Sequence, residues 1–175
     1  MGLEALRAQL PDYAKDLRLN LESVLSEGGA QGLELRALRA VALASAIASR
    51  HRPLVEALEN SAGELLSPAE LGGVRAAAAM MAMTNVYYRF THLASNKEYE
   101  TMRAGLRMNV MRDPGIDKAS YELCALAVSA INGCGACVDS HEKTLREHGV
   151  SAQGVQSAAR IAAVVHAVAV TLEQA

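Results

Sequence analysis

The sequence predicts an all-α fold, a single-domain helical bundle, on three observations. Alanine, the strongest helix former, fills 33 of the 175 positions. The β-branched residues do not gather into the alternating runs that are typical of strands, and only six residues are aromatic. Hydrophobic residues make up 51% of the chain and charged residues 21%, a balance typical of a globular protein. The length fits one domain, which we expect to span residues 1–175.

Composition also excludes several classes of function. The formal net charge is -2 and there is no long basic run, so nucleic acid is not an expected partner. Glu4 and Arg7 interrupt the first apolar stretch, which therefore lacks the hydrophobic region of a secretory signal. The longest charge-free stretches, 76–88 and 123–138, are shorter than the roughly 18 residues that a membrane-spanning helix needs. We expect no membrane and a cytoplasmic location, where three cysteines favour redox or metal chemistry over a disulfide framework.

The first 90 residues are predicted to form a scaffold half made of helices. Leucines spaced three and four residues apart predict a helix that ends at Pro11 and a second one that ends before Gly28. Small and apolar residues predict a third helix over 35–49, and Pro53 suits the first turn of a fourth.

A capping box marks the start of the longest helix of this half. In Ser67-Pro68-Ala69-Glu70, the serine hydroxyl and the glutamate carboxylate can each accept from a backbone amide at the helix start. The helix is predicted to run to about residue 90. Its methionines are interpreted as core residues: Met80, Met81 and Met83.

Residues 91–117 are predicted as a looser connecting segment, because Asn, Gly and Pro recur along it. One short helix is expected there, around 99–111. The half that follows, 118–175, is predicted to hold three helices and the chemistry of the molecule. These helices are expected over 118–132, over 134–148 after an interruption at Gly133, and from a cap at Ser151 to the end.

The two halves show a matched layout. A shift of 84 positions puts Ser45-Ala46-Ile47 on Ser129-Ala130-Ile131, and the capping Ser67 on Ser151, without a gap. Identities are few, so we hold a duplicated helical unit as a hypothesis beside chance similarity. Only the second half carries a cysteine pair, so the first half is expected to be scaffold.

The pair Cys134-Gly135-Ala136-Cys137 is a CxxC motif at the start of a predicted helix. Positions three apart share one helical face, so a reversible disulfide is geometrically allowed. His141 lies one further turn along that face, where its imidazole can accept a thiol proton. A free thiol with a pKa of about 8.5 is only a few per cent ionised at neutral pH, so such a base raises its reactivity.

Zinc binding is the alternative interpretation of these residues. Cys134, Cys137 and His141 would supply three ligands, and Glu122, His148 or water the fourth. A structural zinc site usually pairs two such motifs, and the chain has no second CxxC. The alternative function is then a zinc-binding interaction module without catalysis.

Spacing alone gives the neighbouring polar residues no role. Glu122 is expected to be half-exposed on its helix, and Cys124 is interpreted as a buried inert thiol. His92, near a helix end, is expected to be solvated and outside the site. The helix N-terminus favours Cys134 as the more acidic thiol, since the dipole stabilises a thiolate there.

Several stretches of the sequence, around the CxxC motif and elsewhere in the chain, carry a resemblance to a known family. Around the cysteines they are Tyr121-Glu122-Leu123, Val128-Ser129-Ala130-Ile131-Asn132-Gly133-Cys134, Cys137, Ser140-His141-Glu142 and Thr144-Leu145-Arg146. Elsewhere they are Leu10-Pro11-Asp12-Tyr13-Ala14-Lys15-Asp16, Asn20-Leu21, Met83-Thr84-Asn85-Val86-Tyr87-Tyr88-Arg89, Gly105-Leu106-Arg107-Met108-Asn109 and Pro114-Gly115-Ile116. Together these stretches resemble the AhpD alkyl hydroperoxidases of the carboxymuconolactone decarboxylase-like superfamily, and the resemblance covers nearly the whole chain.

The resemblance implies an all-helical subunit that assembles as a homo-oligomer, trimeric in the best-known form. It implies an antioxidant peroxidase that reduces organic hydroperoxides, regenerates the peroxiredoxin AhpC, or does both. Electrons would come from dihydrolipoyl groups on a 2-oxo acid dehydrogenase component. No bound cofactor and no metal is implied.

Carried onto this sequence, the resemblance assigns four site residues. Cys137 would be the nucleophile that becomes a sulfenic acid or forms the interchain disulfide with the peroxiredoxin. Cys134 would donate a proton and then close the Cys134–Cys137 disulfide. His141 would be the base for Cys137, and Glu122 would orient His141. These roles differ from the reading by spacing, which gives Glu122 no role and makes Cys134 the more acidic thiol.

One departure and one further alternative accompany the resemblance. Some AhpD proteins have a histidine between the cysteines where this chain has Ala136, so any relay through that imidazole is absent. Superfamily relatives also decarboxylate small lactones, without a cysteine pair. A decarboxylase of that type is the second alternative function, although decarboxylation has no evident use for a dithiol.

Overall fold

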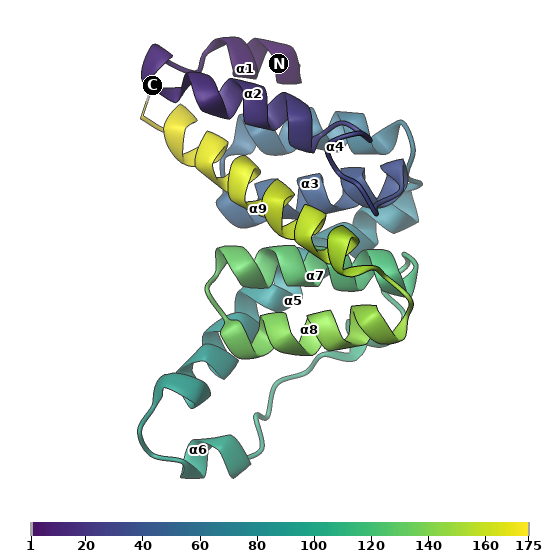
Figure 1. Ribbon diagram of the computed structural model, residues 1–175. Helices are drawn as coiled ribbons and strands as arrows, with labels where there is room; N and C mark the ends of the chain where they lie inside the picture. The colour runs from purple at the N-terminus through teal and green to yellow at the C-terminus, as the bar shows by residue number, and fades with distance from the viewer. Residues whose placement is uncertain (1, 175) are drawn as a thin grey trace.

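The computed structural model describes residues 2–174, and these residues form helices with no strand (Figure 1). This confirms the predicted all-α class. The α-helices are α1 (Leu3–Ala8), α2 (Lys15–Val24), α3 (Leu35–Ser49), α4 (Arg52–Gly63), α5 (Pro68–Leu93), α6 (Glu98–Thr101), α7 (Lys118–Ile131), α8 (Gly135–Glu147) and α9 (Ala152–Leu172). Two 3₁₀ helices, η1 (Asp12–Ala14) and η2 (Asn109–Arg112), complete the elements.

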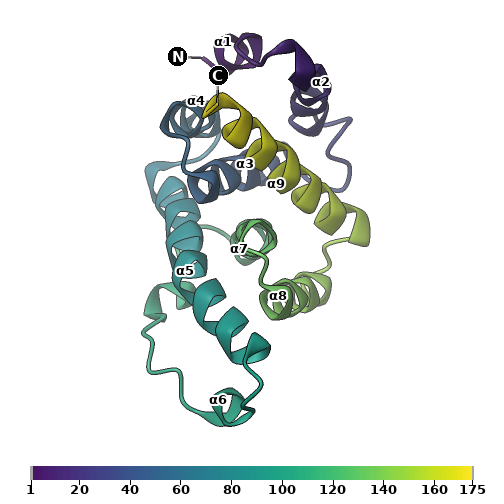
Figure 2. The ribbon, with the colours of Figure 1, turned by 90° about the vertical axis from the view of Figure 1, so that its left-hand side faces the viewer.

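Helix α7 lies at the centre of the fold. It packs on α3, α5, α8 and α9, and Figure 2 shows it nearly end-on between them. Every residue from Ser120 to Ser129 is buried, which explains why this stretch is apolar almost throughout. Glu122 is the one charged residue in that stretch. The central helix therefore carries an ionisable group into the interior.

Side-chain caps begin three of the longer helices as the sequence predicts. Ser67 and Glu70 form the capping box of α5, with both of its reciprocal hydrogen bonds present. Asp117 accepts from the Ser120 amide at the start of α7, and Ser151 accepts from the Gly154 amide at the start of α9.

The connecting segment differs from the prediction of one helix around 99–111. The structure has the single-turn α6 and the 3₁₀ helix η2 there, and residues 102–108 between them are not helical. Gly105 has a φ of 67°, a left-handed conformation that a continuous right-handed helix cannot contain. α5 projects beyond the other helices toward α6, and the segment then returns so that η2 packs on α5 (Figure 1).

Helix α9 packs on α2, α3 and α7. Within the part of the chain that the structure describes, it alone has the length and hydropathy of a membrane-spanning helix. Its buried residues are spread along the helix from Gly154 to Leu172.

The helix boundaries agree with the matched layout of the two halves, but they do not test whether that layout arose by duplication. Shifted by the same 84 positions, the starts of α3, α4 and α5 fall within one residue of the starts of α7, α8 and α9. Duplication of a three-helix unit stays a prediction.

Candidate active site

The cysteine pair sits where α7 ends and α8 begins. The α7 end is closed by two backbone hydrogen bonds, from the Gly133 amide to the Ala130 carbonyl and from the Cys134 amide to the Ser129 carbonyl. Gly133 has a φ of 66°, the left-handed conformation that this type of helix end needs. The chain reverses at once, and Cys134 becomes the residue that caps α8.

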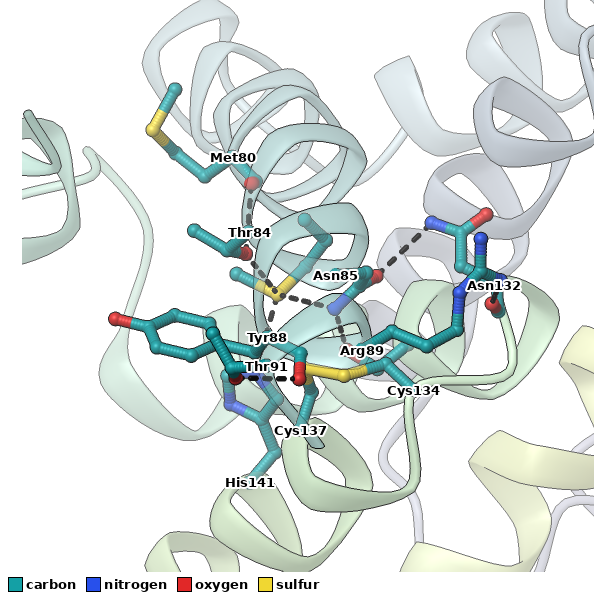
Figure 3. The surroundings of a disulfide bond; sticks show 12 residues. Met80, Thr84, Asn85, Tyr88, Arg89, Thr91, Asn132, Cys134, Cys137 and His141 are labelled. Carbon is teal, nitrogen blue, oxygen red and sulfur yellow. Dashed lines mark hydrogen bonds between the residues drawn. A yellow bond between two sulfur atoms is a disulfide. The ribbon is translucent and has the colours of Figure 1, made fainter. Parts of the chain in front are cut away.

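Cys134 and Cys137 are joined by a disulfide across the first turn of α8, with their Cα atoms 5.3 Å apart (Figure 3). The sequence predicts that the CxxC spacing allows a disulfide, and the structure contains one. Cys134 is 1% exposed and Cys137 is 7% exposed. Only Cys137 of the two lines the cavity described below. An incoming molecule therefore meets the Cys137 sulfur first.

Glu122 and His141 meet in the interior between α7 and α8. The His141 Nδ1 atom lies 2.6 Å from the Glu122 Oε2 atom, and the Lys118 ammonium lies 2.6 Å from Glu122 Oε1. Burial raises the pKa of the Glu122 carboxyl, but the hydrogen bonds from His141 and Lys118 outweigh burial and hold that pKa below its ordinary value. The carboxylate therefore stays ionised near neutral pH.

This arrangement corrects the expectation, made from spacing alone, that Glu122 is half-exposed. The residue is 4% exposed. A carboxylate on a buried helix is stable only if charged or hydrogen-bonding partners surround it, and here Lys118 and His141 supply them. Because Glu122 occupies the Nδ1 side of the ring, the Nε2 atom of His141 is the one left for chemistry.

Helix α5 supplies a polar network behind the disulfide. The Asn85 side-chain amide donates to Ser129 Oγ at 2.9 Å, and Asn132 donates to Asn85 Oδ1 at 3.0 Å. Arg89 donates to the Asn132 carbonyl at 2.5 Å, just before the turn into Cys134 (Figure 3). The network ties α5 to the end of α7 and so fixes the turn that positions the cysteines.

The thioether of Met81 lies at the inner end of this network. Its Sδ atom is 3.2 Å from His141 Nε2, 3.6 Å from Thr84 Oγ1 and 3.7 Å from Asn85 Nδ2. Met81 is buried, as expected of a core residue, but it also contacts the site, which its helical spacing does not indicate.

A cavity of about 410 Å³ reaches the disulfide and the imidazole. Helix α5, the returning segment at η2, and α8 contribute its walls. Its lining residues are Met81, Thr84, Tyr88, Thr91, His92, Met108, Met111, Ala136, Cys137, Ser140 and His141. The lining is mostly apolar, which suits an organic substrate. Ala136, the position that departs from some AhpD proteins, forms part of the wall rather than a proton relay.

The sequence of this chain is similar over its full length to proteins of one family. It is 53% identical over 173 residues to the alkyl hydroperoxide reductase AhpD of Rhodopseudomonas palustris (strain BisA53), covering 99% of this chain and 94% of that protein. It is 55% identical over 169 residues to AhpD of Rhizorhabdus wittichii, covering 97% and 96%. The corresponding protein of Streptomyces coelicolor is 53% identical over 173 residues, covering 99% and 96%. The chain belongs to the AhpD family.

Residues 97–175 also match the model of the carboxymuconolactone decarboxylase family. The match begins just before α6 and contains all four AhpD-type site residues that the resemblance assigns to this chain. Met81, Asn85 and Arg89 lie outside it, on α5, which ends before residue 97.

The structure brings together all four site residues that the AhpD resemblance assigns. Cys137 and His141 share the cavity, Cys134 is bonded to Cys137, and Glu122 holds His141. In this disulfide form no hydrogen bond joins His141 to Cys137 among the described residues. Sequence reasoning missed Met81, Lys118 and His92 as neighbours of the site. Lys118 was detectable, since it stands one helical turn before Glu122 on a predicted helix.

The third cysteine of this AhpD chain takes no part in the site. Cys124 is fully buried in α7 and is not disulfide-bonded. Burial raises the pKa of the Cys124 thiol, which keeps it protonated and unreactive. As for metal binding, the residues that the structure describes include no cluster of three His, Cys, Asp or Glu side chains placed to hold an ion.

Proposed function

We propose that this chain is an alkyl hydroperoxide reductase that cycles Cys134 and Cys137 between a dithiol and a disulfide. One observation carries the proposal: the sulfur of Cys137 and the imidazole of His141 face one apolar cavity, while Glu122 holds the far side of the imidazole. The family relatives named alkyl hydroperoxide reductase support the same activity.

The oxidation proceeds in two steps. His141 takes the proton of Cys137, and the thiolate attacks the terminal oxygen of the hydroperoxide. The O–O bond breaks, Cys137 becomes a sulfenic acid, and the alkoxide takes a proton from Cys134 and leaves as the alcohol. The Cys134 thiolate then attacks the Cys137 sulfur and closes the disulfide. The S–O bond breaks, and the hydroxide takes the proton from His141 and leaves as water.

Glu122 acts in these steps by holding His141. Its carboxylate accepts from Nδ1, which fixes the proton there and turns Nε2 toward the cavity. Negative charge beside the ring also stabilises the imidazolium that forms when Cys137 loses its proton. Lys118 on the other carboxylate oxygen keeps Glu122 ionised and limits its freedom to rotate.

Reduction of the disulfide begins at Cys137, because this sulfur faces the cavity and Cys134 does not. A dihydrolipoyl thiolate attacks Cys137, releases Cys134 as a thiolate, and leaves a mixed disulfide. The second dihydrolipoyl thiol then closes its own disulfide and frees Cys137. In the second route, reduced Cys137 attacks the disulfide of an oxidised peroxiredoxin AhpC and forms an interchain disulfide before Cys134 resolves it.

These steps need no bound cofactor, and the dihydrolipoyl group of a partner protein serves as the reductant. We propose that the chain works in the cytoplasm as a homo-oligomer, a trimer as the AhpD resemblance implies. A 2-oxo acid dehydrogenase component would be the lipoylated partner.

The lactone decarboxylase alternative is favoured by one observation, the family match over residues 97–175. The two functions differ in their need for sulfur. If the chain is a decarboxylase, Cys134→Ala and Cys137→Ala should keep the activity on a lactone acid. If it is a peroxidase, both variants should lose hydroperoxide turnover.

Intact mass spectrometry tests the proposal directly. Reduced protein treated with a slight excess of an organic hydroperoxide should lose about two hydrogens, located by peptide mapping to the peptide of Cys134 and Cys137. Dihydrolipoamide should reverse the change. Cys124→Ala is the matched control and should behave as the parent protein. An unchanged mass would contradict the dithiol cycle, and one zinc per subunit in protein purified without chelator would favour the metal-binding alternative.

A further inference from the structure

Residues 102–112, which run from the end of α6 through η2, form an exposed basic stretch that we call the basic arm. Arg103, Arg107 and Arg112 are exposed, and none of them has a hydrogen-bond or ion-pair partner within residues 2–174. The arm contains no acidic residue, although the whole chain has a net charge of -2. Positive charge that the fold leaves unpaired is therefore gathered on one segment.

The acidic residues at the two ends of the basic arm do not neutralise it. Glu100 is paired with Lys97 at 2.7 Å. Asp113 follows the arm directly and forms no ion pair with a described residue. Charges farther away are screened over about 8 Å at physiological salt, so a molecule that touches the arm meets its local positive charge.

The basic arm stands beside the cavity that leads to Cys137. Met108 and Met111 of the arm line this cavity, and Arg107 and Arg112 flank them directly in sequence. The arginines themselves do not line the cavity and are exposed. Their charges are therefore presented to a molecule that approaches the cavity from outside.

The arm also presents apolar side chains of the kind found at protein interfaces. Met102 is 56% exposed and Val110 is 40% exposed. Methionine and arginine are enriched where proteins meet, whereas lysine is depleted there, and every basic residue of the arm is an arginine. This composition favours a protein partner over a small ion.

The burial of Cys137 limits what such a partner can insert. The residue is 7% exposed, so a folded protein surface cannot reach its sulfur. The reductant of the proposed cycle is a dihydrolipoyl group carried by a partner protein. Such a narrow group can enter the cavity while its protein stays outside, next to the basic arm.

We propose that the basic arm is the docking surface for the protein that reduces the disulfide, and that this partner presents an acidic surface around its dihydrolipoyl group. The proposal rests on the dithiol cycle proposed above. In the docked pair, two dihydrolipoyl thiols become one disulfide and the Cys134–Cys137 disulfide becomes two thiols, so two electrons and two protons pass to this chain. Opposite charges raise the rate of encounter and hold the register of the pair.

The rate of reduction of the disulfide form by three reductants tests the docking. The reductants are dihydrolipoamide, a short peptide with a dihydrolipoyl-lysine between four glutamates, and the same peptide with four glutamines. Acid quenching and alkylation of the free thiols, read by mass, give each rate. The glutamate peptide should react about tenfold faster than the glutamine peptide at low ionic strength. The difference should vanish in 1 M salt, where screening acts over about 3 Å.

Two variants with the same change of net charge locate the effect. The arm variant replaces the three arginines: Arg103→Gln, Arg107→Gln and Arg112→Gln. The control variant makes three changes on α2 and α4, at the end of the molecule opposite α6 (Figure 1): Lys15→Gln, Arg18→Gln and Arg52→Gln. The arm variant should lose the advantage of the glutamate peptide and keep the parent rate with dihydrolipoamide. The control variant should keep both.

Three results would overturn the proposal: equal rates with the two peptides, an advantage that survives in the arm variant, or an equal loss in the control variant. A lower molar mass of the arm variant in light scattering would also overturn it, because the arm would then join copies of this chain. If dihydrolipoamide fails to reduce the parent disulfide, the proposed function is contradicted instead. Fluorescence anisotropy of the labelled, oxidised peptides then decides the docking, which requires tighter binding of the glutamate peptide to the parent than to the arm variant.

Discussion

Replacement of Glu122 by Gln removes one charge from the interior and keeps the shape of the side chain. The carboxylate is 4% exposed and holds two partners, His141 and Lys118, each at 2.6 Å. Gln offers one acceptor oxygen, and its amide group would turn two protons toward one of these donors. The variant therefore loses at least one charge-assisted hydrogen bond in a buried place.

The two contacts contribute unequally. The bond to buried His141 is of the kind that contributes about 1.5–3 kcal/mol, whereas an ion pair to half-exposed Lys118 contributes about 1 kcal/mol or less. We expect Glu122→Gln to lower the free energy of unfolding by about 2 kcal/mol at neutral pH. Because the folded pKa of Glu122 lies below its ordinary value, the stabilisation is fully present above the unfolded pKa and is lost as the pH falls through the folded pKa.

Urea unfolding of the disulfide form, followed by circular dichroism, measures this difference. It should be about 2 kcal/mol near neutral pH and should shrink as the pH falls below the unfolded pKa of the Glu122 carboxyl. Glu142→Gln is the control, because it makes the same change at a half-exposed α8 residue whose ion pair with Arg146 measures 3.9 Å. Its expected effect is below about 0.5 kcal/mol. Equal losses in both variants, or a Glu122→Gln difference that persists in acid, would refute the reasoning.

Three further changes test the fold. Tyr121 is fully buried, burial raises its pKa to about 12, and its hydroxyl has no hydrogen-bond partner among residues 2–174. Tyr121→Phe should therefore unfold at an equal or higher urea concentration than the parent, and a loss of stability above about 1 kcal/mol would reveal a missing partner. Gly133→Ala should destabilise the protein by about 1 kcal/mol in thermal unfolding, because alanine is strained at a φ of 66°. Gly135→Ala is the control: an added Cβ at this α8 residue has nothing within 4 Å, so the variant should be neutral or stabilising. Ser67→Ala should lower stability by about 1 kcal/mol through loss of the α5 cap, and an unchanged melting temperature would contradict that role.

The helices were predictable because their ends are encoded locally. Ser67, Asp117 and Ser151 are capping residues in the sequence, and each caps a helix in the structure. The conformation of residues 91–117 was not predictable in this way, because that part of the sequence contains few local signals of structure. Its shape depends on the left-handed Gly105 and on the packing of η2 against α5, a contact between residues distant in sequence.

The residues of the site also divide into those that the sequence could predict and those that it could not. Cys134, Cys137 and His141 lie within eight residues on one helix end, so spacing alone brings them together. Glu122 reaches His141 from another helix, and only the family resemblance indicated its role. Met81 belongs to a third helix, and its apolar side chain at helical spacing looks like any other core position. Contacts between helices were beyond what periodicity can show.

The burial of Cys124 fixes how many electrons one subunit can hold. With the Cys124 thiol enclosed in α7 and kept protonated, the dithiol cycle proposed above uses one pair of the three cysteines. In that cycle each subunit carries two electrons, and Cys124 is no partner for disulfide reshuffling. A titration with oxidant should reach its end point at one equivalent per chain, and an oligomer should store one electron pair for each of its subunits.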